Sequence, residues 1–247
     1  MDREEMIKNM MNRPPLGPDD KFRFHCTACG DCCYDPEGII LSAGDIYRGA
    51  KFLGMKAGSF VEQYCRMYVG PQSRLPLLTV KTEGPRKKCI FLDGRGKCRI
   101  HPAKPSVCEV FPLGRTMDVR SPGSVEYRLS PVSCGKRCRE HTVREWLSGT
   151  GLEKSNELFS AWTSGIGELV DRTKKLYDLA GDMLIALVAP DVANILYCDY
   201  DTEEEFLPQF RENIRRLTVL LDRIEDFVRK EKAKQGRTEK TEGTDNG

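Results

Sequence analysis

The sequence predicts an α+β protein: a small, cysteine-rich, metal-organised head with short strands and helices, followed by a mainly α-helical C-terminal segment. Three observations support this prediction. Ten of the eleven cysteines among the 247 residues lie between Cys26 and Cys138. The same region has many short apolar stretches broken by Gly and Pro, whereas the second half has long apolar stripes with helical periodicity. Because such short stretches bury little apolar surface, we expect a bound metal to fix the head.

The chain divides into four predicted parts. Residues 1–20 are polar and rich in proline, which predicts a flexible N-terminal arm. Residues 21–140 form the cysteine-cluster metal-binding domain, and residues 141–232 form the helical segment. Residues 233–247 are charged and then rich in Gly, Thr and Glu, which predicts a disordered tail.

The head is predicted to contain two helices among short strands. A strand is expected over residues 38–41, and Ser42 is placed to N-cap a helix over residues 44–53. Ser59 is expected to cap the second helix. Asp93-Gly94 indicates a hairpin turn between two of the later strands. These later strands are expected over residues 77–82, 89–92, 97–100, 113–120 and 124–129.

Helices are expected throughout the second half. A short one covers residues 142–147. Apolar residues then recur at steps of three and four from Leu158 to Ala180, and again from Phe206 to Val228. Such stripes are typical of a core face, and the amphipathic C-terminal helix is also a candidate surface for a protein partner.

Composition excludes several classes of protein. No apolar run approaches the roughly 18 residues that a membrane helix needs, and residues 1–20 lack the apolar region of a signal peptide. We therefore expect a cytoplasmic protein with no membrane partner, in which crowded cysteines are metal ligands rather than disulfides. Residues 1–140 hold 24 Lys/Arg against 16 Asp/Glu, a net charge of +8. The basic residues around Cys89 and Cys98, at positions 86–88, 95, 97 and 99, have no stacking aromatic residues interleaved with them. This disfavours nucleic acid as a partner.

The strongest motif is the run Cys26-Thr-Ala-Cys29-Gly-Asp-Cys32-Cys33. A two-residue gap lets two sulfurs reach one ion at about 2.3 Å, and Gly30 permits the tight backbone that this needs. The C-x₂-C-x₂-C spacing occurs both in zinc sites and in iron–sulfur proteins. The side chains of the adjacent Cys32 and Cys33 are expected to point apart, so that one of them faces a second metal or serves as a structural thiol.

Two further sets of cysteines follow. Cys89 and Cys98 flank the predicted hairpin, and Cys108 lies three residues after Pro105, which is placed to start a short helical turn. The third cysteine set is the C-x₃-C pair of Cys134 and Cys138. The predicted metal ligands are Cys26, Cys29, Cys32, Cys33, Cys89, Cys98, Cys108, Cys134 and Cys138. They suffice for two four-ligand centres with one cysteine left over, or for one cluster with spare thiols. The other two, Cys65 and Cys198, are expected to be buried thiols.

The run CTACGDCC, followed by CIFLDGRGKCRIHPAKPSVCEVFP, resembles the CxxCxxCC cysteine-cluster family. This family is also called YkgJ-type, and its members are regarded as zinc- or iron-chelating proteins. The segment between the two motifs is similar to the family's strand followed by two small helices, and the resemblance covers about residues 22–140. It implies metal binding through the cysteines at 26, 29, 32, 33, 89, 98 and 108. A flagellin lysine methylase is similar in its cysteine motifs, so methyl transfer is one inherited possibility.

These observations predict a protein that holds zinc or iron through its cysteines, in one or two centres. A [4Fe–4S] cluster is one form that the iron could take, and it would suit a redox or electron-transfer role. Two alternatives stay open: a metal-dependent enzyme that modifies a partner protein, as a lysine methylase does, and a zinc-stabilised adaptor. Ligand type does not separate zinc from iron–sulfur, because both accept four thiolates. No phosphate-binding loop, nucleophile elbow or HExxH motif is present, so no catalytic residue is assigned.

Overall fold

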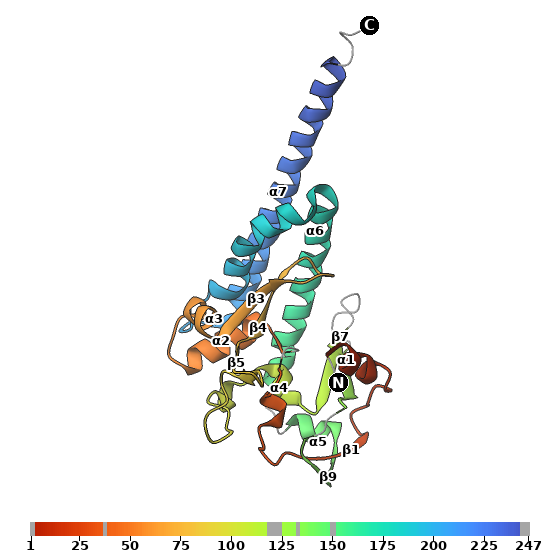
Figure 1. The fold of residues 1–247 in the computed structure, drawn as a ribbon, viewed down its shortest axis with the longest axis vertical. Coiled ribbons are helices and arrows are strands. Elements are labelled where there is room, and N and C mark those ends of the chain that lie inside the picture. The colour runs from red at the N-terminus through yellow and green to blue at the C-terminus, as the bar shows by residue number, and fades with distance from the viewer. Residues whose placement is uncertain (1–2, 37–38, 118–124, 132–133, 149–151, 243–247) are drawn as a thin grey trace.

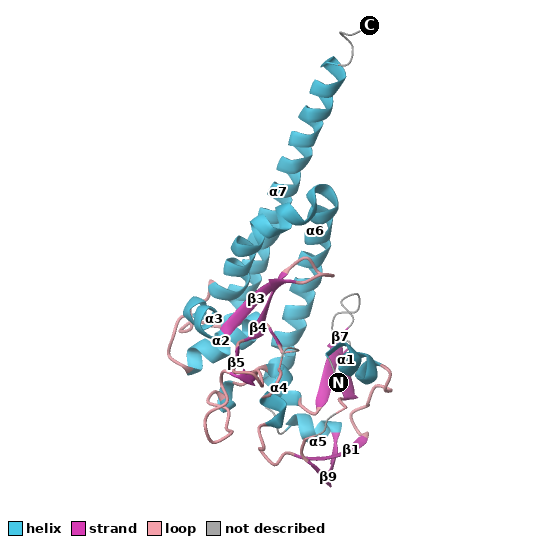
Figure 2. Cartoon of the chain, viewed as in Figure 1, coloured by secondary structure: helices cyan, strands magenta, loops and turns pink. Residues whose placement is uncertain are grey.

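The fold was analysed in a computed structural model, which describes residues 3–36, 39–117, 125–131, 134–148 and 152–242. Helices and short β-ribbons make up the molecule (Figures 1 and 2). The helices are α1 (Arg3–Met11), α2 (Ala43–Phe52), α3 (Ala57–Tyr64), α4 (Ser106–Val110), α5 (Val143–Ser148), α6 (Leu152–Ala193) and α7 (Phe206–Glu242), with helical turns η1 (Asp31–Cys33), η2 (His101–Ala103) and η3 (Asn194–Cys198). The strands are β1 (Lys21–His25), β2 (Ile40–Leu41), β3 (Cys65–Val69), β4 (Pro76–Val80), β5 (Thr82–Glu83), β6 (Lys88–Cys89), β7 (Leu113–Met117), β8 (Val125–Leu129) and β9 (Lys136–Thr142). The predicted α+β class is confirmed.

The strands form four small antiparallel sheets. The largest has the order β2-β4-β3, and alternate residues of β4 are buried, as expected for a strand with one face on a core. The other three sheets are the pairs β1-β9, β5-β6 and β7-β8. The β1-β9 pair joins residues more than a hundred positions apart, with Phe22 opposite His141. This pair brings the start of the first cysteine run beside the third cysteine set.

Local sequence explains the helix that follows β2. Ser42 accepts a hydrogen bond from the Asp45 amide at 3.1 Å, and the Asp45 carboxylate accepts one from the Ser42 amide at 2.9 Å. This is the reciprocal capping box that satisfies the free amides of a first helical turn. The predicted Ser42 cap is thus confirmed. The Ser59 cap is wrong, because α3 already begins at Ala57 and Ser59 lies inside it.

One core joins the head to the C-terminal helices. Buried Leu41, Phe60 and Leu78 of the head belong to the same apolar cluster as Leu176 of α6 and Leu217 of α7. Hydrogen bonds reinforce the junction: the Tyr197 hydroxyl donates to the carbonyl of Pro76, and the Thr173 hydroxyl donates to that of Ser73. The predicted head and helical segment therefore share one large core. Both predicted helical stripes supply residues to it.

A smaller core lies under the β1-β9 pair. Phe22, Phe24, Leu113 and Val143 are its buried members. The Trp146 ring packs edge-on against both phenylalanines, and its indole N–H donates to the carbonyl at the C-terminal end of α4, 3.1 Å away. This contact ties the smaller core to the helix that carries Cys108.

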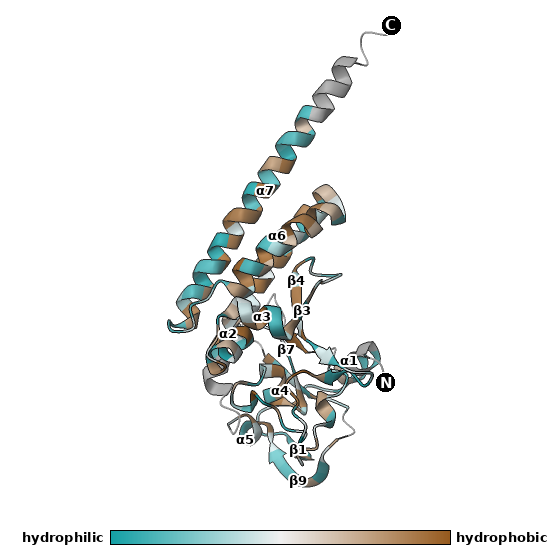
Figure 3. Ribbon diagram, turned by 60° about the vertical axis from the view of Figure 1, so that its left-hand side comes forward, coloured by the Kyte–Doolittle hydropathy of each residue, from teal (hydrophilic) through white to brown (hydrophobic). Residues whose placement is uncertain are grey.

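Helix α6 contains a reversal at Gly181. This residue has φ 70° and ψ −165°, a conformation that only glycine adopts without strain, and the helix continues after it in a new direction (Figure 1). Figure 3 shows apolar residues concentrated along α6, whereas polar and apolar residues interleave along α7. The sequence analysis did not predict this turn, because the helical stripe that it found ends at Ala180.

Several predicted boundaries differ from the structure. Residues 3–11 of the predicted arm form α1, and residues 233–242 of the predicted tail continue α7. Residues 97–100 form no strand; a single bridge between Leu92 and Cys98 closes the hairpin instead. The strands expected over 113–120 and 124–129 are confirmed in β7 and β8, while residues 118–124 lie outside the described residues. The flexibility of the arm and of the tail stays a prediction.

Within the described residues, one helical stretch, Glu157–Cys198, is long and apolar enough to cross a membrane by length and composition alone. Charged residues such as Glu168, Asp171 and Arg172 interrupt this stretch, so it contains no unbroken apolar run long enough to be recognised in the sequence. Gly181 reverses the chain inside this stretch, and Leu169 and Leu176 are buried in the larger core. Since a core helix passes the same test, the absence of a membrane partner stays a prediction.

Replacing Gly49 with alanine is expected to destabilise the head by about 1–3 kcal/mol. A Cβ at this position of α2 would lie 2.6 Å from Cε2 of Phe60, which is almost fully buried and cannot move aside cheaply. The matched control is Gly58→Ala in α3, whose Cβ would meet only ordinary contact at 3.6 Å. Urea denaturation of both variants checks this, and equal stabilities would contradict it.

Candidate metal centre

The first cysteine run forms a tight loop at the end of β1. Its backbone adopts left-handed conformations at Ala28 and Gly30, with φ of 53° and 79°. The turn η1 follows at once, and the Cys33 amide donates to the carbonyl of Gly30 at 2.9 Å. The glycine predicted from the motif spacing is therefore the residue that turns the chain. Cys26, Cys29 and Cys32 are exposed, and Cys33 is half-buried.

The two adjacent cysteines lie side by side. The Sγ atoms of Cys32 and Cys33 are 4.0 Å apart, so the expectation that their side chains point apart is wrong. The reason is the 3₁₀ turn, which rotates successive side chains by about 120° rather than the 180° of an extended chain. Two thiolates on one tetrahedral zinc lie about 3.8 Å apart when each bond is about 2.3 Å. Both sulfurs are thus spaced for one ion.

The second set is folded by the turn at Asp93. The Asp93 carboxylate accepts hydrogen bonds from the amides of Arg95 and Lys97, both at 2.8 Å, which closes the loop. The bridge between Leu92 and Cys98 then brings Cys98 back toward Cys89 at the end of β6. Turn-forming aspartate between the two cysteines is the local cause of this arrangement.

Cys108 is supplied by α4. The Cys108 amide donates to the carbonyl of Pro105 at 2.9 Å, so the predicted helical turn that begins after Pro105 is confirmed. A proline in this position pre-sets the backbone for a helix start.

The first two sets dock onto each other through their loops. A Cβ added to Gly30 would lie 3.3 Å from the Gly96 carbonyl oxygen and 3.4 Å from Leu92, so the two loops are in close contact there. The Lys97 ammonium donates to the carbonyl of Ala28 at 3.4 Å. The glycines of both loops therefore let the two cysteine sets approach.

The thiols of these segments interact electrostatically. The pKa of Cys32 is raised by its hydrogen bond with Cys33, then by burial and by the charge of Cys33. Burial is the main cause of the raised pKa of Cys89, Cys98 and Cys108, and the charge of Cys32 contributes at all three. Five of the nine predicted ligands, from three separate segments, are thus close enough for their charges to interact, and we call these five the gathered thiols.

A buried carboxylate holds the helix of Cys108 in place. Asp45 of α2 accepts from the Ser106 amide at 2.8 Å, and its side chain is only 3% exposed. Arg48 bridges the same carboxylate at 2.8 Å and Glu109 of α4 at 3.3 Å. Asp45 also closes the capping box of α2, whereas its contact with α4 depends on tertiary packing and has no local signal in the sequence.

The third set lies at the edge of this group. Burial raises the pKa of Cys134 to about 11, and the charges of Cys32, Cys29 and Asp31 contribute. Cys138 is exposed on β9. No contact in the described part of the chain links Cys26 or Cys138 to the gathered thiols, so their assignment as ligands stays a prediction.

The two cysteines predicted to be structural lie elsewhere. Cys65 is buried, and burial raises its pKa to about 12, with a contribution from the charge of Cys198. Cys198 is half-buried in η3. No disulfide links any of the eleven cysteines in this structure.

The donor set suits zinc or iron. Five clustered sulfurs are the soft ligands that both metals accept. Within the described ranges, no three cysteine, histidine, aspartate or glutamate side chains already lie close enough to hold one ion. A bound ion would therefore draw the three segments together, as it does in proteins where metal binding completes folding.

Comparison with known families gives one match for this region. Residues 25–135 match the CxxCxxCC family, described as "Putative zinc- or iron-chelating domain". The match spans every cysteine of the gathered group. No curated protein and no solved structure matches the chain.

Proposed function

We propose that this chain binds zinc or iron through Cys32, Cys33, Cys89, Cys98 and Cys108, because residues 25–135 match the CxxCxxCC family. One observation carries the proposal: thiols of three separate segments lie close enough for the charge of Cys32 to raise the pKa of Cys89, Cys98 and Cys108. A cation would compensate the charge of thiolates held this closely, since metal coordination deprotonates a thiol outright. Cys29 and Cys134 are proposed as further ligands, because the charges of Cys29 and Cys32 both act on Cys134.

An iron–sulfur form would support electron transfer. Cys26, Cys29 and Cys32 are exposed, so a centre held by the first run would lie at the protein surface, where a partner protein can approach. Zinc in the same ligands has no redox chemistry and would serve to fix the loops. The identity of the metal therefore decides between a redox role and a structural one.

Anaerobic purification followed by metal analysis, acid-labile sulfide analysis and a visible spectrum tests the proposal. We expect stoichiometric zinc or iron in the reduced protein. Colourless protein with zinc would favour the structural role, and brown protein with iron and labile sulfide would favour the redox role. Only substoichiometric traces of either metal, in protein that has also been offered both, would contradict metal binding.

A further inference from the structure

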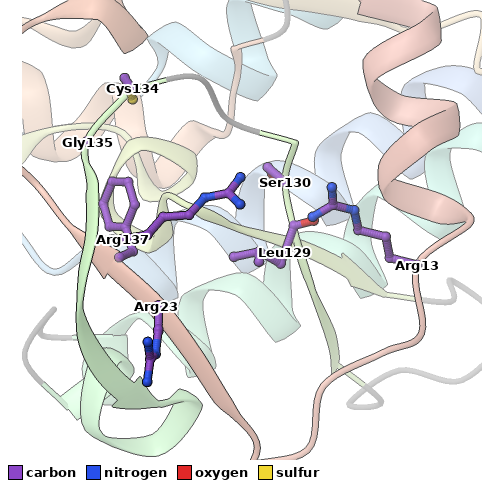
Figure 4. Close-up of a pocket in the computed structure, with 8 residues that line it drawn as sticks. Arg13, Arg23, Leu129, Ser130, Cys134, Gly135 and Arg137 are labelled. Atoms are coloured by element: carbon purple, nitrogen blue, oxygen red, sulfur yellow. The ribbon is translucent and has the colours of Figure 1, made fainter.

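A second feature of the head is a cavity of about 260 Å³ beside the third cysteine set (Figure 4). It is lined by residues of four segments that are distant in sequence: the chain after α1, β1, the end of β8 and the start of β9. Its polar lining includes Arg13, Arg23 and Arg137, and no acidic side chain lines it. Three cations around one concavity create a positive potential that attracts anions.

Two of the arginines converge. Figure 4 shows the side chains of Arg137 and Arg13 extending toward Ser130 from opposite sides, while Arg23 extends away from them. Arg13 is held in place on two sides: its Nη1 donates to the carbonyl of Leu129 at 3.1 Å, and its own carbonyl accepts from Arg128 Nε at 3.0 Å. The guanidinium at this wall of the cavity is therefore pre-positioned.

The charges of the arginines are compensated unequally. Arg23 lies 3.7 Å from the Glu140 carboxylate, which also pairs with Lys21. Arg137 has no hydrogen bond or ion pair to any residue that the structure describes. Among the residues that the structure describes, the Arg13 guanidinium is paired with a neutral carbonyl, so two guanidinium charges face the cavity with no described acidic partner there.

The floor and the wall keep the cavity open. Phe24 at its base is buried in the smaller core. A Cβ at Gly135 would lie 2.5 Å from Cε2 of Phe24 and 3.0 Å from the carbonyl of His25, and the φ of Gly135 is 77°. Only glycine therefore allows the chain just before β9 to pass this close to β1 at the wall of the cavity.

We propose that this cavity binds a small oxyanion, one that carries phosphate or carboxylate groups. The planar fork of a guanidinium donates two parallel hydrogen bonds to such groups, and two forks can hold one anion from opposite sides. The volume lies below the usual range for drug-sized ligands, so a compact anion fits. This site is distinct from the proposed metal centre: Cys134 lines the cavity, but the groups that would bind the anion are the arginines.

Isothermal titration of the full-length protein with inorganic phosphate and with malonate tests the site. We expect saturable binding of at least one of them, weakened about tenfold or more by Arg137→Ala, because a hydrogen bond to a charged group is lost. The anion affinity of Arg137→Lys should lie between that of the wild type and that of Arg137→Ala, since an ammonium keeps the charge but lacks the planar fork of a guanidinium. The control is Arg139→Ala, which removes an equal charge from the same strand but from a residue outside the cavity.

The two titrations, with phosphate and with malonate, identify the chemical class of the ligand. Binding of phosphate alone indicates a phosphate compound, malonate alone indicates a dicarboxylate, and both indicate a general oxyanion site. The proposal is overturned if neither anion binds saturably. It is also overturned if the Arg137→Ala and Arg139→Ala variants bind the anion with the same affinity. Metal content is measured on the same samples, so that loss of the metal centre is recognised separately.

Discussion

Replacing Cys32 with alanine is expected to lower metal affinity by about 100-fold or more, because even residues that merely support metal ligands cost 10–100-fold when removed. Cys32 is the thiol whose charge acts on Cys89, Cys98 and Cys108 alike, and its sulfur lies 4.0 Å from that of Cys33. Loss of its sulfur therefore removes the thiol that interacts with those of both other segments. Metal content after dialysis against a weak chelator measures the effect.

The matched control for this experiment is Cys198→Ala. Cys198 is half-buried in η3. Its charge acts on Cys65, which is not one of the gathered thiols. We expect wild-type metal content in this variant. Equal metal content in the Cys32 and Cys198 variants would show that the gathered thiols do not hold the metal.

Replacing Asp45 with alanine is expected to lower the free energy of unfolding by about 3 kcal/mol, since it leaves the partly buried Arg48 without its closest anion. The same change releases the Ser106 amide at the start of α4, 2.8 Å from the carboxylate. The helix that carries Cys108 is then held less firmly, and we expect metal affinity to fall about tenfold. Denaturation and metal titration of the same variant measure both effects.

An exposed ion pair gives the control for Asp45. Asp19 lies 3.1 Å from Arg144 with 82% of its side chain exposed, so Asp19→Ala should cost less than about 0.5 kcal/mol. Metal affinity should not change in this variant. A similar loss of stability in both variants would mean that burial of the Asp45 pair is not what matters.

Features set by neighbouring residues could be predicted from the sequence. The Ser42 cap, the turn that Pro105 starts and the tight loop at Gly30 each depend on a few adjacent positions. The helical stripes of α6 and α7 were equally clear, because a core face repeats every three or four residues. Within the site, the clustering of the second set with the first followed from the motif spacing and from the family resemblance.

Features set by distant residues could not be predicted. The pairing of β1 with β9 joins segments far apart in the chain, and β9 has no alternating pattern that would mark it as the partner of the alternating β1. The Asp45 contact with α4 and the convergence of Arg13 with Arg137 arise only after these segments pack. The proximity of Cys32 and Cys33 was missed for a different reason: it depends on a 3₁₀ turn, for which extended-chain geometry was the wrong reference.

The shared core has a consequence for biosynthesis. The ribosome releases the cysteine segments first, yet Leu41, Phe60 and Leu78 find their apolar partners only once α6 and α7 have emerged. Until then, ten thiols are carried by a nascent chain that cannot complete its packing. Thiols that stay unlinked until α6 and α7 have emerged would therefore let this core close without competition from premature disulfides.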